Sequence, residues 1–104
     1  MTDEAIEAHY AAKLNAGGQV PSRKTIRRQW SIGSVRADQI YIRLTARRLA
    51  HLPAGEIPAA VAALPAEDIG KVREILGAVV AADGTGFGPN AATAHKACTA
   101  ALAG

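Results

Sequence analysis

With 104 residues and a formal net charge of +3, the chain has the length of one domain, which can bury a core without metal or disulfide support. Its one cysteine, Cys98, excludes an internal disulfide, and no apolar stretch approaches the roughly 20 residues that a membrane span needs. Apolar residues make up 49% of the chain but aromatic residues only 4%, and many are alanine, so the composition predicts an all-α protein.

The first helix is expected to begin near Thr2 or Asp3, because acidic residues in its first turns suit the helix dipole. Ile6, Tyr10 and Leu14 recur every four residues and predict a buried stripe along it. Gly17-Gly18 is expected to end this helix, since glycine is common just after a helix C-terminus.

The next segment predicts two helices joined by a tight turn. Ser22 is a good N-cap for a helix that reaches Trp30, and a third helix is expected over residues 34–51. Between them lies the turn Ser31-Ile32-Gly33, in which Gly33 is expected to permit a backbone geometry that a side chain would resist. The apolar positions have the spacing that two helices crossing around a tight turn require: Ile26, Trp30, Ile32, Ala37 and Ile40.

Positive charge is concentrated on this same segment. Of the 12 basic residues, eight fall within residues 20–51, where Asp38 is the sole acid: Arg23, Lys24, Arg27, Arg28, Arg36, Arg43, Arg47 and Arg48. Concentrated basic charge on a helix-turn-helix pattern is typical of proteins that bind nucleic acid. We therefore predict a three-helix helix-turn-helix core that binds double-stranded DNA.

The predicted interface has two sets of residues. Residues near the start of the third helix are expected to contact base edges in the major groove: Ser34, Val35, Asp38 and Gln39. Basic residues on either side are expected to contact phosphates, which sets register rather than sequence: Arg23, Lys24, Arg27, Arg28, Arg36 and Arg43.

The chain divides by composition into a helix-turn-helix region, residues 1–52, and an Ala-rich helical region, residues 53–104. After a link at residues 53–55, helices are expected over residues 58–64 and 65–82, then a flexible loop over residues 83–89 and a last helix over 91–102 that Asn90 caps. Residues 56–104 are expected to pack on the first region or to form a homodimer interface.

Other motifs predict no chemistry. The glycines of residues 84–88 follow a helix and lack the lysine of a phosphate-binding loop, so a plain connector is expected. The three histidines have no partner ligands at metal spacing, and no catalytic set is evident, so we expect no metal, no cofactor and no enzyme activity. No basic region followed by an apolar run occurs at the start of the sequence, so we expect no signal peptide and a cytoplasmic protein without a membrane partner.

Residues 5–48 resemble a helix-turn-helix module of plasmids and phages. The similarity rests on the run from Tyr10 to Ser22, on Ile26-Arg27 and Trp30, and on Gly33-Ser34 before a basic helix. This pattern is similar to the N-terminal domain of KfrA-type plasmid proteins and to modules of actinobacterial plasmid-transfer proteins. The resemblance implies that Arg27, Gly33, Ser34 and Arg36 hold positions used on DNA. Two features depart from it, since Trp30 stands where leucine is common and no long coiled coil follows.

These observations favour a sequence-specific DNA-binding protein, such as a small transcriptional regulator or accessory factor of a phage, prophage or plasmid. The alternative is a helical interaction module that uses its basic face to bind an acidic protein.

Overall fold

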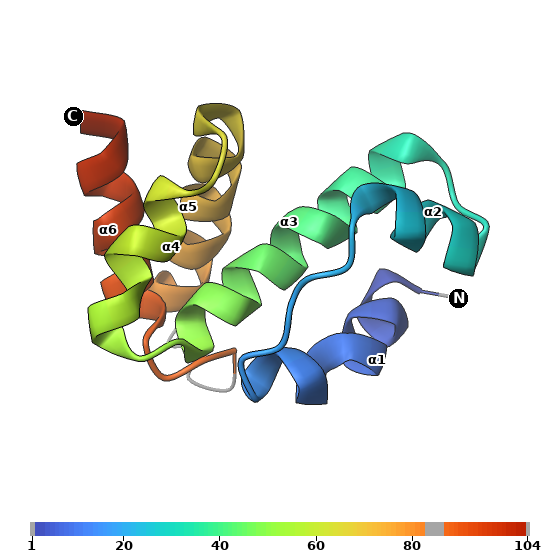
Figure 1. Ribbon diagram of the computed structural model, residues 1–104, viewed down its shortest axis with the longest axis horizontal. Helices are drawn as coiled ribbons and strands as arrows, with labels where there is room; N and C mark the ends of the chain where they lie inside the picture. The colour runs from blue at the N-terminus through green and yellow to red at the C-terminus, as the bar shows by residue number, and fades with distance from the viewer. Residues whose placement is uncertain (1, 83–86, 104) are drawn as a thin grey trace.

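The computed structural model describes residues 2–82 and 87–103, and within these ranges the chain is helical with no strand (Figure 1). The predicted all-α class is confirmed. The elements are α1 (Asp3–Asn15), α2 (Arg23–Trp30), α3 (Ser34–His51), the short 3-10 helix η1 (Ala54–Glu56), α4 (Ile57–Ala62), α5 (Ala66–Ala81) and α6 (Ala91–Ala103). No helix in the described ranges is both long and apolar enough to cross a membrane.

Helices α1, α2 and the first half of α3 enclose one apolar core. Thr2 caps α1 by accepting a hydrogen bond from the Ala5 amide, and Gly17, at φ 88°, ends the helix in the left-handed region. The core consists of Ile6, Tyr10, Leu14, Ile26, Ala37, Ile40 and Leu44, with Val20, Trp30, Ile32 and Tyr41 packed at its edge. The stripe predicted along α1 is therefore buried.

Helix α3 is the centre of the molecule because it carries a second apolar face. That face packs on α4, α5 and α6, which lie together around the C-terminal half of α3 (Figure 1). It contributes Ile42, Ala46, Leu49 and Ala50 to a second core, which α4 to α6 complete with Ile57, Val61, Ile69, Val72, Leu76, Ala94 and Cys98 among others. Ile42 is therefore buried against the second half of the chain, not against α1 and α2.

The chain segment before α6 is fastened to the end of α3. Phe87 and Gly88 are buried, and the backbone N–H of Asn90 donates to the Ala50 carbonyl. Asn90 lies directly before α6, as predicted, and its carbonyl accepts a hydrogen bond from the Ala94 backbone amide, while its side chain donates to the Leu52 carbonyl at 2.7 Å. Of the connector predicted over residues 83–89, residues 83–86 lie outside the described part of the chain.

The turn between α2 and α3 differs from the prediction in one respect. Ser31, not Gly33, adopts the left-handed conformation, at φ 51°. Gly33 has an ordinary φ of −72°, and a Cβ built there would meet nothing within 4 Å. The special backbone geometry of this turn therefore falls on a serine, whose side chain makes that conformation costly.

Candidate nucleic-acid interface

The turn sets the start of α3 beside the basic end of α2. The Arg27 carbonyl accepts hydrogen bonds from the Ser31 and Ile32 amides, which reverses the chain within three residues. Gly33 then serves as the N-cap of α3 and supplies no side-chain cap. The first amides of α3 consequently lack a side-chain acceptor from the cap position, and they add partial positive charge at this point.

A basic hollow of about 570 Å³ lies between α2 and the start of α3. This basic hollow is lined by Arg23, Lys24, Arg27, Arg28, Ile32 and Ser34. Lys24, Arg27 and Arg28 are exposed, and none of them forms a hydrogen bond or ion pair through its side chain with another residue in the described ranges. Their charges are therefore available to an anion from outside.

The charges in the first turn of α2 oppose the helix dipole, whereas Arg27 and Arg28 in its last turn suit it. Its first turn holds no acidic residue and two basic ones, Arg23 and Lys24, next to the positive end of the helix dipole. By contrast, acidic residues occupy the first turns of α1 and α5. Helices that break a local rule without evident compensation are often functional, and Lys24 has no compensating carboxylate within the described residues.

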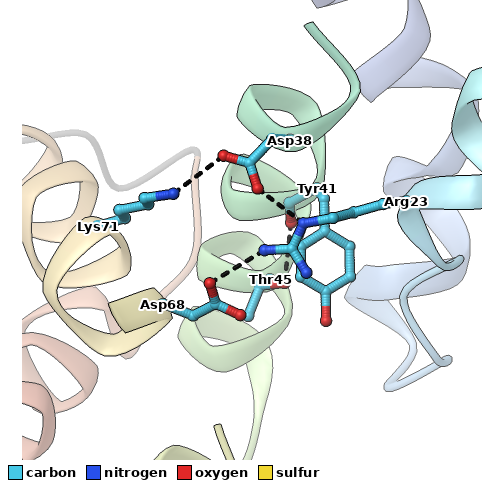
Figure 2. Close-up of polar contacts among 6 residues, drawn as sticks. All are labelled: Arg23, Asp38, Tyr41, Thr45, Asp68 and Lys71. Atoms are coloured by element: carbon cyan, nitrogen blue, oxygen red, sulfur yellow. Dashed lines mark hydrogen bonds and ion pairs between the residues drawn. The ribbon is translucent and has the colours of Figure 1, made fainter. Parts of the chain in front are cut away.

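Arg23, predicted to contact phosphate, is already bound to two carboxylates. Its Nε donates to Asp38 at 2.7 Å, its Nη2 donates to Asp68 at 3.0 Å, and its guanidinium lies 4.1 Å from the centre of the Tyr41 ring (Figure 2). The Asp68 side chain is only 3% exposed. Arg23 therefore joins α2 to both α3 and α5.

Arg36 and Arg43, also predicted to contact phosphate, lie on another flank of α3 and face α1. Arg36 pairs with Asp3 at 2.7 Å, and Arg43 pairs with Glu7 at 2.8 Å. Glu7 is buried and also accepts from Arg47 at 3.1 Å. Both arginines remain partly exposed, but these carboxylates offset much of their charge.

The residues predicted to contact bases form one wall of a groove of about 680 Å³ between α3 and α5. Ser34, Val35 and Gln39 are exposed, and Val35 is 72% exposed although it is apolar. Asp38 lies beside them but accepts hydrogen bonds from Arg23 and, at 3.1 Å, from Lys71 of α5. The hydrogen bond from Arg23 lowers the pKa of Asp38; burial opposes this shift, and the bond from Lys71 adds to it.

The opposite wall of this groove was absent from the sequence-based prediction. It is formed by Lys71, Glu74 and Ile75, which come from α5. Nothing in the spacing of these residues indicates which helix they face, because the crossing of α5 over α3 depends on packing between distant segments. Any ligand that reaches the first turns of α3 from this side must fit beside α5.

The described ranges contain no candidate metal site. They hold no group of three His, Cys, Asp or Glu residues arranged to bind a metal ion. Cys98 is fully buried in the second core, where burial raises the pKa of its thiol. The comparisons of this chain with protein-family models, with curated proteins and with solved structures find no match.

Proposed function

We propose that the protein binds double-stranded DNA through α2 and the first turns of α3. The observation that carries this proposal is the basic hollow, in which Lys24, Arg27 and Arg28 are exposed and have no carboxylate partner in the described residues. Cations that are not neutralised internally attract phosphates and release counterions when they bind them. The uncapped start of α3 adds to the same attraction.

Within this proposal the residues have different tasks. Lys24, Arg27 and Arg28 contact phosphates, while the internal ion pairs of Arg23, Arg36 and Arg43 make their contributions smaller. The exposed Ser34, Val35 and Gln39 lie where base edges would be read: Gln39 fits adenine, and Val35 fits the thymine methyl group. Sequence preference therefore depends on uncharged residues next to the charged ones.

A role as a small regulator or accessory factor of a phage, prophage or plasmid is proposed on the sequence resemblance alone. We also propose that two copies bind together, because one such module makes few phosphate contacts. The second half offers two exposed large apolar side chains to a dimer interface, Val80 on α5 and Leu102 on α6. Sedimentation of the protein with and without a duplex distinguishes one bound copy from two.

The test is a fluorescence-anisotropy titration of a duplex of about 30 base pairs, repeated from about 50 to 200 mM salt. Lys24→Ala with Arg27→Ala should weaken binding at least tenfold at about 50 mM salt, and the salt slope should fall by about 1.8 because two phosphate contacts are lost. The matched control is Lys13→Ala with Lys96→Ala, which removes the same charge from α1 and α6.

Equal loss in both double variants would show that attraction is diffuse rather than centred on the basic hollow. Failure of the wild type to bind any duplex at low salt would overturn the proposal. In that case the same three free cations would fit the other candidate, a module that binds an acidic protein. If the wild type binds DNA, selection of bound sequences from a random pool tests whether it prefers particular bases. Gln39→Ala is expected to change the preferred base.

A further inference from the structure

Asp38 places a negative charge at the end of α3 that is proposed to contact DNA. Its side chain is 32% exposed and lines the groove together with Ser34, Val35 and Gln39. An aspartate with the ordinary pKa of 3.8 is already ionised at neutral pH, and the hydrogen bond from Arg23 lowers the pKa of Asp38 further. Its charge must therefore be balanced by cations rather than removed by protonation, or it will repel an approaching phosphate chain.

The balancing cations come from two different helices. Arg23 of α2 bonds one carboxylate oxygen, Oδ1, at 2.7 Å, and Lys71 of α5 bonds the other, Oδ2, at 3.1 Å (Figure 2). Arg23, however, also bonds the buried Asp68 at 3.0 Å. The cluster therefore holds two cations and two carboxylates, a net charge of zero, and without Lys71 its net charge would be −1.

Lys71 is well placed to act through Asp38 rather than through packing. Its side chain is 51% exposed, and it lines the groove opposite the first turns of α3. Because Arg23 divides its charge between two carboxylates, Lys71 is the cation that brings the cluster to neutrality. The second half of the chain thereby contributes to the electrostatics of a surface that is built on α2 and α3.

We propose that Lys71 is a positioning residue of the nucleic-acid interface, which neutralises Asp38 so that a DNA duplex can approach the start of α3. This inference rests on the proposed function. It assigns to α5 a part in binding that goes beyond packing, and it distinguishes Lys71 from Lys24, Arg27 and Arg28, which act by contacting phosphates themselves.

A double-mutant cycle on a random-sequence duplex tests the inference. Lys71→Ala should weaken binding about three- to tenfold at about 50 mM salt, because the cluster acquires one uncompensated negative charge near the phosphates. In an Asp38→Asn background the same Lys71→Ala change should alter affinity less than about twofold, because Lys71 then has no carboxylate partner and Arg23 neutralises the remaining Asp68. Lys96→Ala, the control for loss of one distant positive charge, should leave affinity unchanged.

Three results overturn the inference. The first is an unchanged affinity in Lys71→Ala while the wild type binds DNA. The second is an equal loss in the presence and absence of Asp38→Asn, with a salt slope reduced by about 1, since Lys71 would then contact a phosphate directly. The third is a wild type that binds no duplex, which overturns the proposed function as well. Thermal unfolding of each variant confirms that the helices remain folded.

Discussion

Replacing Arg23 with alanine should separate the structural task of this residue from that of its neighbours on α2. The change removes the 3.0 Å hydrogen bond to Asp68, the 2.7 Å bond to Asp38 and the contact with the Tyr41 ring. It also leaves the Asp68 carboxylate, 3% exposed, with no other side-chain hydrogen bond among the described residues.

The size of the effect follows from these contacts. Losing the charge-assisted bond to the buried Asp68 costs about 2 kcal/mol, a value at the low end because the Arg23 side chain is 39% exposed and screened by water. The more exposed Asp38 pair adds about 0.5 kcal/mol, and the Tyr41 contact adds a similar amount. The sum is about 3 kcal/mol, which corresponds to a fall of about 15 °C in Tm for a domain of this size.

The assay is thermal unfolding followed by circular dichroism at neutral pH, with Arg28→Ala as the control. Arg28→Ala removes the same charge from the same helix but breaks no ion pair within the described residues, so its free energy of unfolding should change by less than about 0.5 kcal/mol. If Arg23→Ala and Arg28→Ala melt at the same temperature, the bridge from α2 to α5 does not stabilise the fold and the reasoning is wrong.

The difference in stability between the wild type and Arg23→Ala should depend on pH, and the sign of this dependence follows from the Arg23–Asp38 ion pair. The pKa of Asp38 is lowered below its ordinary value of 3.8 in the folded state, chiefly by the hydrogen bond from Arg23. The stability that this pair contributes is therefore present above pH 3.8 and is lost as the pH falls through the lowered pKa. The gap in stability between the wild type and Arg23→Ala should narrow over that acidic range, and a gap that widened there would contradict the assignment.

Three further predictions concern backbone and core positions. Gly88→Ala should destabilise the protein strongly, because a Cβ there would lie 2.4 Å from the Ala50 Cβ and 2.9 Å from the Ala50 backbone. Gly33→Ala is the control and should be tolerated, because a Cβ at Gly33 meets nothing within 4 Å. Equal melting temperatures of the two variants would contradict the prediction. Ser31→Gly should raise the free energy of unfolding by about 1 kcal/mol in urea titrations, because glycine relieves the cost of a φ of 51°; a loss of stability would count against it. The Cys98 thiol should react with a disulfide reagent only as fast as the protein unfolds, and rapid labelling of the folded protein would show that it is accessible.

The local features of this fold were readable from the sequence, because short-range chemistry determines them. Ser22 was predicted as the N-cap of α2, and its side chain accepts a hydrogen bond from the Thr25 amide. The first helix was expected to begin near Thr2 or Asp3, and α1 begins at Asp3. The position of α3 was likewise predicted, and the spacing identified Ile26, Ala37 and Ile40, which are buried in the first core, together with Trp30 and Ile32, which lie at its edge. Helix caps and apolar periodicity depend on residues only a few positions apart, so they can be recognised in the sequence alone.

The site was only partly predictable, because its electrostatics depend on segments far apart in the chain. Arg23 and Asp68 are 45 positions apart, and Asp38 and Lys71 are 33 apart. No local pattern reveals that Arg23 is held by internal carboxylates while Arg28, on the same helix, is not. Counting basic residues therefore located the concentration of positive charge on α2 and α3 but did not identify which of these charges lack an internal carboxylate partner.

The middle of α3 belongs to both cores at once, and this has a consequence for how the molecule opens. Leu44 lies in the first core and Ala46 in the second, whereas α1 contributes to the first core and α6 to the second. Detachment of either outer helix therefore disrupts one core, whereas α3 cannot unwind until both cores are disrupted. Its central amides should be the slowest in the chain to exchange hydrogen with solvent, at a rate set by complete unfolding.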